Sequence, residues 1–198
     1  MDAAVEIRRL TPELAEDYAR FFDDTPYNSG ERCYCVTWRS DAAYADGMHW
    51  YPTPEQRRER AMAYVRSGGI QGYLAFCGGR AVGWCNVGSD CGFCVDYLRA
   101  FWPIAARADG ERIRSVFCFL VAPDMRGRGV ARQLLARVAA DAAQEGFDFV
   151  ESYASASEDC HGSVDLYESC GFVCGGERDG RTVMRYYIIK EGNRTHDK

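Results

Sequence analysis

Hydrophobic and polar positions alternate along the chain in a way that separates short strands from amphipathic helices. Strands are predicted where apolar, β-branched and aromatic residues form short runs or alternate with polar ones. The predicted strands cover residues 5–10, 73–77, 81–87, 113–121, 147–153, 172–176 and 182–189. The predicted helices cover residues 11–22, 53–67, 130–144 and 164–169. Because strand–helix–strand units occur in the second half and hairpins elsewhere, we expect an α/β fold with a mixed sheet and helices on both faces.

Two of the predicted helices begin with capping signals. Thr11 precedes Pro12, and this pair is typical of an N-cap followed by the first helical turn. Thr53 is followed three residues later by Gln56, which predicts a reciprocal capping box. The second of these helices should end at Gly68, because glycine readily adopts the left-handed conformation that closes a helix.

Length and charge narrow the class of protein. The chain has 198 residues, 47% of them hydrophobic, and we predict one domain over residues 1–190 followed by a polar tail at 191–198. A formal net charge of −5 without a basic run argues against nucleic-acid binding. The chain shows no apolar run of bilayer length and no signal peptide at its start. We therefore expect a cytoplasmic protein without a nucleic-acid or membrane partner.

Ten cysteines require an interpretation. Disulfide frameworks belong mainly to small secreted domains, so reduced thiols are the expectation here. An alternative is a four-thiolate zinc site built from Cys33-x-Cys35 and Cys91-x-x-Cys94. Zinc-ligand pairs usually have about two to four intervening residues, whereas the first pair has one. We therefore expect no metal. A redox role for the Cys91–Cys94 pair is a weaker alternative, because no thioredoxin-like strand–helix arrangement surrounds it.

The most informative segment joins the predicted strand that ends at Val121 to the helix that begins at Val130. Its glycines, Gly127 and Gly129, allow the backbone to approach a ligand closely. The first N–H groups of the helix and its dipole favour an anion. Arg126 and Arg128 add charges that do not titrate. We therefore predict a pyrophosphate site, and the alternative is an ordinary strand-to-helix turn with solvated arginines.

Two motifs in this order resemble the GNAT N-acetyltransferase superfamily. The run from Arg126 to Ala131, Arg-x-x-Gly-x-Ala, is similar to the acyl-CoA signature of that family. The run from Leu166 to Phe172, Leu-Tyr-x-x-x-Gly-Phe, is similar to its later tyrosine element. The resemblance covers residues 113–184 at the level of motifs, and the order of elements extends it to most of the chain. It implies a bacterial GNAT-like protein with a mixed, mostly antiparallel sheet of about seven strands.

The resemblance also implies acetyl-CoA as co-substrate and assigns its contacts. In the family, the main chain of the strand before the loop binds the pantetheine arm and the thioester carbonyl, and loop amides hold the pyrophosphate. The implied coenzyme-binding residues are Phe119, Val121, Arg126, Gly127, Arg128, Gly129, Val130, Ala131 and Tyr167. A phenol, with an ordinary pKa of about 10, is a plausible acid for the departing thiolate. Tyr167 is therefore the predicted catalytic acid, and a purely structural aromatic is the alternative.

The general base is less clear from the sequence. Many relatives carry a Glu six residues before the position of Val121, and this chain has Ser115 there. Glu151, a carboxylate within an apolar strand, is the predicted replacement, because burial raises a carboxyl pKa towards neutrality. A Glu facing solvent is the alternative, and Asp148 or a water chain are other candidates for the base. The family often has Asn seven residues before the tyrosine; this position is Cys160 here, and His161 next to it is a candidate contact for cofactor or acceptor.

The acceptor is expected to bind opposite the coenzyme, among segments rich in aromatic residues and cysteine. Cys35, Trp38 and Trp84 are the predicted pocket walls, and a second small core is the alternative. The function expected from the resemblance is direct transfer of an acetyl group from acetyl-CoA to a primary amine of a small molecule. The alternative is a GNAT-fold protein that binds or senses acyl-CoA with little or no turnover. Relatives are often dimers, so a homodimer is possible.

Overall fold

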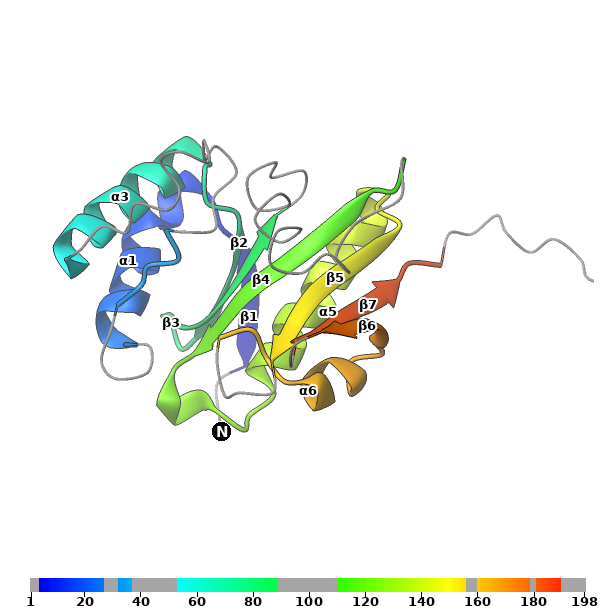
Figure 1. Ribbon diagram of the computed structural model, residues 1–198. Helices are drawn as coiled ribbons and strands as arrows, with labels where there is room; N and C mark the ends of the chain where they lie inside the picture. Colours follow the sequence, from blue (N-terminus) through cyan, green and yellow to red (C-terminus); the bar gives the residue numbers. More distant parts are fainter. Residues whose placement is uncertain are drawn as a thin grey trace, which may run out of the picture.

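The computed structural model describes residues 4–26, 32–36, 53–88, 110–155, 160–178 and 181–189. Seven strands form one sheet in the order β1-β2-β3-β4-β5-β7-β6 (Figure 1). The strands are β1 Val5–Arg9, β2 Gly72–Cys77, β3 Arg80–Gly88, β4 Ile113–Val121, β5 Phe149–Ser155, β6 Val173–Arg178 and β7 Arg181–Tyr187. This sheet confirms the predicted mixed α/β architecture.

The pairing is antiparallel everywhere except between β4 and β5. β4 is followed by a helix that returns the chain to the same edge, and this crossover makes the β4–β5 pair parallel. β2 and β3 are joined by a hairpin at Gly78 and Gly79, both with positive φ, as the glycine pair predicts. β6 and β7 form the second hairpin and end the sheet.

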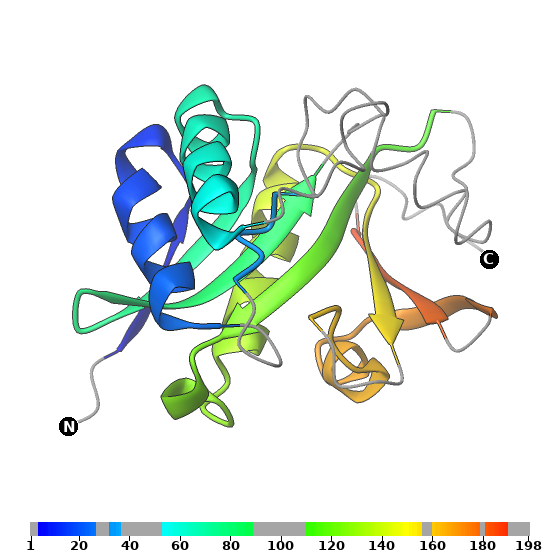
Figure 2. The same ribbon diagram turned by 60° about the vertical axis from the view of Figure 1, so that its left-hand side comes forward.

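Helices cover both faces of the sheet (Figures 1 and 2). On one face α1, Ala15–Asp24, and α3, Pro54–Ser67, lie over the first strands. On the other face lie α5, Val130–Gln144, and α6, Val164–Glu168. Two separate hydrophobic clusters result, one beneath each helical layer.

Most predicted boundaries agree with the structure. β4 and α5 have the predicted bounds, and Thr53 and Gln56 form the predicted capping box. Thr11 is different: it precedes a short 3-10 helix, η1 Pro12–Leu14, and its side chain makes no capping hydrogen bond. The N–H of Leu14 donates instead to the backbone carbonyl of Thr11 at 3.0 Å, so this amide has a partner without the hydroxyl.

Two other features around α5 differ from the prediction. β5 begins at Phe149 rather than Phe147, because Phe147 still belongs to the turn that closes α5 and donates its N–H to the carbonyl of Ala142. The loop before α5 contains a second 3-10 helix, η3 Pro123–Met125, which the sequence pattern did not predict.

A close contact fixes the beginning of α5 above the sheet. A Cβ added to Gly83 in β3 would lie 2.8 Å from Cγ1 of Val130, so only glycine allows the helix this close. Leu134, one turn later, lies 3.4 Å from the same point and is fully buried. The helix start, and the loop that precedes it, are therefore positioned by core packing.

Among the described helices, none has the length and apolarity needed to span a bilayer.

Candidate active site

The loop before α5 presents open backbone at the helix start. Gly127 and Gly129 have φ of +73° and +76°, a region that L side chains rarely adopt. A Cβ on either glycine would find nothing within 4 Å, so both face open space. Gly129 is the N-cap residue and has no side chain with which to cap the first amides. The loop therefore presents the open backbone and uncapped helix start on which the predicted anion site depends.

A cavity of about 330 Å³ lies at this loop. Its lining comes from the end of β4, the loop, the first turn of α5 and α6, namely Val121, Met125, Arg126, Gly127, Gly129, Val130, Ala131, Arg132 and Leu166. Nε of Arg126 donates to the carbonyl of Val121 at 3.3 Å, which holds the guanidinium beside the cavity. Six of the eight residues predicted to bind the coenzyme besides Tyr167 line this one cavity.

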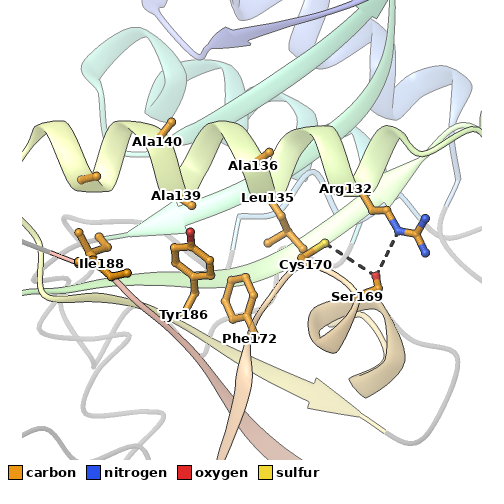
Figure 3. A pocket seen from close by; sticks show the side chains of 12 residues that line it. Arg132, Leu135, Ala136, Ala139, Ala140, Ser169, Cys170, Phe172, Tyr186 and Ile188 are labelled. Carbon is orange, nitrogen blue, oxygen red and sulfur yellow. Dashed lines mark hydrogen bonds between the residues drawn. The ribbon is translucent and has the colours of Figure 1, made fainter.

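A larger groove of about 590 Å³ continues along α5 on the same face of the sheet (Figure 3). Arg132 lines both cavities, and its Nε donates to Oγ of Ser169 at 3.1 Å, which links α5 to the end of α6. Beyond Arg132 the groove is apolar: alanines of α5 face Phe172, Tyr186 and Ile188 across it. The two cavities together extend from the loop along the flank of α5.

Strands β4 and β5 separate next to the loop. They pair from Ile113 with Phe149 to Val116 with Ser152 and then diverge, as Figure 2 shows. On its other side β4 has a register irregularity, so that Val116 and Cys118 have partners in β3 and Phe117 lies between them. Such a bulge increases local twist and bends the strand, which opens the pair.

Residues 160–162 lie between the diverged ends of the two strands. The N–H of Phe119 donates to the carbonyl of Cys160 at 2.6 Å, and the N–H of Ser155 donates to the carbonyl of Gly162 at 3.2 Å. Nδ1 of His161 lies 2.9 Å from the carbonyl of Phe117. A carbonyl only accepts, so this nitrogen carries the proton and Nε2 is the basic nitrogen of the neutral ring. The N–H of Phe119, which was predicted to meet the coenzyme, is thus bonded to the chain itself.

Tyr167 is fully buried at this junction. Its hydroxyl donates to the carbonyl of His161 at 2.7 Å, and its ring lies 6.0 Å from that of Phe119. Gly162 makes this position possible, because a Cβ there would lie 3.2 Å from the tyrosine ring. Tyr167 therefore lies next to β4, the strand predicted to bind the thioester. Residues 160–162 connect the two, because the carbonyl of His161 accepts the tyrosine hydroxyl and that of Cys160 accepts the N–H of Phe119.

Glu151 lies in a buried polar cluster on the neighbouring strand. It is the cross-strand partner of Ser115, the position at which relatives of the resembled family carry Glu. Its Oε1 accepts a hydrogen bond from the hydroxyl of Tyr153 at 2.9 Å, and its Oε2 accepts one from Nε of Arg185 at 2.8 Å. Oγ of Ser115 lies 3.2 Å from the same tyrosine oxygen. The carboxylate is 1% exposed, which excludes the alternative of a solvent-facing Glu.

Burial is the main influence on the titration of this cluster. It raises the pKa of Glu151, and the hydrogen bond and charge of Arg185 oppose that rise without cancelling it. Burial also raises the pKa of Tyr153 well above its ordinary value, and the nearby carboxylate adds to the effect. The phenol therefore stays protonated over the physiological range.

Two of the three predicted acceptor residues lie in one hydrophobic cluster. Trp84 is fully buried beneath α1, with its ring 4.9 Å from that of Tyr18 in an edge-on contact. Cys35 is buried in the same hydrophobic cluster. Trp38 lies outside the described residues. The packing of Trp84 and Cys35 fits the alternative of a second core, and their contact with an acceptor stays a prediction.

The segment of Cys33 and Cys35 has an unusual backbone. Tyr34 and Cys35 have φ of +48° and +51°, and two consecutive non-glycine residues in this region are uncommon. The hydroxyl of Tyr18 donates to the carbonyl of Tyr34 at 2.6 Å, which helps to hold the turn. Within the described ranges no group of three or more potential ligands is arranged for a metal, and Cys91 and Cys94 lie outside those ranges.

Comparison with known families decides what this arrangement belongs to. The sequence profile of the acetyltransferase (GNAT) family matches residues 32–172, which include the loop, the splayed strands and Tyr167. The chain belongs to the GNAT family of acetyltransferases. No curated protein sequence matches it.

Solved structures of GNAT proteins share the fold of this family member. An acetyltransferase of Streptococcus pneumoniae is 18% identical, with 94% of this chain and 100% of that chain covered and a TM-score of 0.56. A mosquito arylalkylamine N-acetyltransferase-like protein is 14% identical, covers 93% and 100%, and has a TM-score of 0.61. PaiA N-acetyltransferase of Thermoplasma acidophilum, solved in complex with coenzyme A, is 15% identical, covers 93% and 99%, and has a TM-score of 0.55. At these identities the likeness shows the fold.

Sequence reasoning on this GNAT protein missed three features of the site. Tyr153 and Arg185, which contact Glu151, were not singled out, and neither was the carbonyl of Cys160. Tyr153 carried a usable signal, because it stands two residues after Glu151 and so shares its strand face. Arg185 and the Cys160 carbonyl carried none, since one depends on strand register and the other on backbone.

Proposed function

We propose that this protein transfers an acetyl group from acetyl-CoA directly to a primary amine of a small molecule. The observation that carries the proposal is the convergence of three elements at one place. These are the open helix start at Gly129, the diverging β4 and β5, and Tyr167 beside the gap. Membership of an acetyltransferase family supplies the class of reaction.

The coenzyme is assigned to the face of the sheet that carries α5. Its pyrophosphate would accept hydrogen bonds from the amides of the Gly127–Ala131 backbone, with Arg126 beside it. Arg132 lines both cavities, so the nucleotide end of the coenzyme would enter the larger groove at that residue. The pantetheine arm would run along β4, where the N–H of Phe119 is the donor for the thioester carbonyl. The carbonyl of Cys160, which accepts this N–H, must then yield it.

The chemistry needs groups for two protons. A primary amine, with a pKa of about 10, must lose protons on the way to the amide. The ammonium form first gives one proton to solvent. We assign removal of the N–H proton of the neutral amine to Glu151, whose raised pKa suits a general base. The departing thiolate takes a proton from Tyr167, whose hydroxyl hydrogen can turn from the His161 carbonyl to the sulfur. The resulting phenolate regains a proton from solvent before the next turnover.

Acetyl transfer to a panel of small amines tests this function. The panel should contain polyamines, arylalkylamines and amino acids, and acetylated products should be read by mass spectrometry. We expect at least one amine to be acetylated at a rate that Tyr167→Phe and Glu151→Gln both reduce. An active wild type whose rate is the same in both variants would contradict the assigned roles.

Two observations favour a second function. The N–H of Phe119 already donates to Cys160, and Ser115 supplies no carboxylate on β4. A protein that binds acyl-CoA as a signal, with little turnover, would tolerate both features. This alternative predicts tight acetyl-CoA binding without products from any amine of the panel, and with no change in either variant.

A further inference from the structure

We propose that Ser115, Tyr153 and Glu151 form a proton relay in which the Ser115 hydroxyl meets the acceptor amine and Glu151 finally takes the proton. The inference rests on the proposed function and names the path of its proton. In this relay the base that β4 lacks at Ser115 is supplied by Glu151, its cross-strand partner on the adjacent strand β5.

The direction of each hydrogen bond follows from the donors available. A phenol has one hydrogen and a carboxylate only accepts, so the hydroxyl of Tyr153 donates to Oε1 of Glu151 at 2.9 Å. The tyrosine oxygen can then only accept from Ser115, whose Oγ lies 3.2 Å away. The Ser115 hydroxyl in turn has lone pairs for a further donor. All bonds in the chain therefore point toward the carboxylate.

The relay is placed at the point where the two strands begin to diverge. Ser115 and Glu151 pair across β4 and β5 one step before the last pair, Val116 with Ser152. Both residues are buried, and Ser115, 6% exposed against 1% for Glu151, is the less deeply buried end of the relay. The ring of Phe117, two residues along β4, stacks on that of Tyr153 at 5.9 Å and fixes the phenol between the two strands.

Arg185 holds the far end of the relay in position. Its Nε bonds Oε2, the carboxylate oxygen that Tyr153 does not use. Its guanidinium lies 5.0 Å above the ring of Phe149. A Cβ on Gly175 would lie 3.2 Å from Cδ of Arg185, so glycine leaves room for this side chain on the edge strand. Arg185 is therefore a positioning residue that acts through Glu151.

The charged groups around Glu151 set the direction of its titration. Burial raises its pKa most, Arg185 and Tyr153 lower it by hydrogen bonding, and the charge of Glu111 raises it. Arg185 keeps its proton because Glu151, and next to it Tyr187, raise its pKa. On β4, the facing group is the neutral Ser115. Removing the cation would raise the pKa of Glu151 further, so more of the base would be protonated at neutral pH.

The proton balance of the step is simple. One N–H bond of the acceptor nitrogen breaks as it attacks the thioester, and its proton passes to Ser115. The hydroxyl proton of Ser115 passes to Tyr153, and the phenol proton passes to the carboxylate of Glu151. Each relay hydroxyl gives one proton and receives one, so of the three relay residues only Glu151 changes charge. It becomes a neutral carboxylic acid and later returns its proton to solvent.

Three variants with matched controls test the relay. Ser115→Ala, Tyr153→Phe and Glu151→Gln each remove one member, and each should lower kcat by about 10²- to 10⁴-fold, the usual range for general base catalysis. Ser152→Ala is the control for the serine, because its buried Oγ has no hydrogen-bond partner among the described residues. Tyr73→Phe is the control for the tyrosine, because Tyr73 donates to Asp141 at 2.8 Å on the other face. Both controls should leave kcat within about two-fold.

The double variant Ser115→Ala/Glu151→Gln separates a relay from two independent effects. Residues that act as one unit are non-additive, so the double variant should be no slower than the slower single variant. Multiplied losses would overturn the relay, and so would normal activity of Ser115→Ala. Acetyl-CoA affinity, measured by calorimetry in the same variants, should stay unchanged.

The pH dependence gives a readout that a structural role would not move. With an aryl amine, which stays neutral over the range, kcat should rise with pH as Glu151 loses its proton. Arg185→Met should shift this rise to higher pH, and Arg185→Lys should shift it less, because the charge is kept. An unshifted profile in Arg185→Met would overturn the assignment of Glu151.

The failure of the relay can be told apart from the failure of the proposed function. A wild type that fails to bind acetyl-CoA would overturn both, whereas an active wild type with fully active relay variants would overturn the relay alone.

Discussion

The coenzyme loop and the buried carboxylate cluster are two halves of one site, and they are built in different ways. The loop consists of backbone from six consecutive residues, with glycines where φ is positive and a helix start behind them. The cluster consists of side chains from β4, β5 and β7, brought together by strand register. A site made of backbone can be recognised from a short run of sequence. A cluster of side chains cannot, because a residue on one strand can be replaced in its role by a residue on the adjacent strand.

The comparison predicts that damage to each half has a different kinetic signature. Loop variants should lose coenzyme affinity and keep kcat, because the loop holds the phosphates. Cluster and acid variants should lose kcat and keep affinity, because they act on protons.

Outside the relay, the largest effect is expected from Tyr167→Phe. Without the phenol the thiolate leaves unprotonated, so kcat should fall by about 10²-fold or more. The acetyl-CoA dissociation constant should change little, because a single hydrogen bond to the His161 carbonyl is lost inside the protein. Steady-state kinetics and calorimetry on the same preparation check this. A loss of affinity with kcat unchanged would place Tyr167 in the binding half.

A smaller effect is expected from Arg126→Ala. A charge-assisted contact with phosphate is worth about 1.5–3 kcal/mol, or roughly ten- to a hundred-fold in dissociation constant. The loss should shrink as salt rises, because screening weakens the wild-type contact. Arg80→Ala is the control, since Arg80 forms an exposed ion pair with Asp124. Equal coenzyme affinity in Arg126→Ala and Arg80→Ala would remove Arg126 from the site.

The smallest effect concerns stability in the cluster. Ser115→Ala removes a hydrogen bond to Tyr153 and should lower the free energy of unfolding by about 1 kcal/mol. Ser152→Ala removes a buried hydroxyl that has no partner among the described residues, so it should be neutral or stabilising by a similar amount. Urea denaturation of both variants measures the difference. Equal destabilisation by Ser115→Ala and Ser152→Ala would mean that the hydrogen bond between Ser115 and Tyr153 does not stabilise the fold.

The parts of this protein that the sequence predicted are those with local causes. The Arg126–Ala131 loop, the Thr53 capping box and the amphipathic α5 each follow from neighbouring residues. Glu151 was predicted as a buried base because a carboxylate within an apolar strand is unusual. Its burial is confirmed, and its catalytic role stays a prediction.

The features that the sequence did not predict depend on which strands and helices lie next to each other in the fold. Arg185 reaches Glu151 only because β7 pairs antiparallel with β5 in one register, which hydrophobic alternation does not determine. Trp84 is buried beneath α1, and its residue type alone could not show that this helix covers that face of β3. The contact of Cys160 with β4 is made by its carbonyl, so its side chain gave no indication of it.

Calorimetric titration of acetyl-CoA into three proteins tests the central claim most directly. Gly129→Ala and Gly79→Ala introduce the same methyl group at φ of +76° and +80°, and in both cases nothing lies within 4 Å of it. Their backbone strain should therefore match, at about 1–2 kcal/mol each. Only the first places its methyl group where the pyrophosphate is expected. We predict binding by the wild type and Gly79→Ala, and loss of at least about ten-fold in affinity for Gly129→Ala. Equal affinity of the two variants, or no binding by the wild type, would contradict the coenzyme site proposed for this loop.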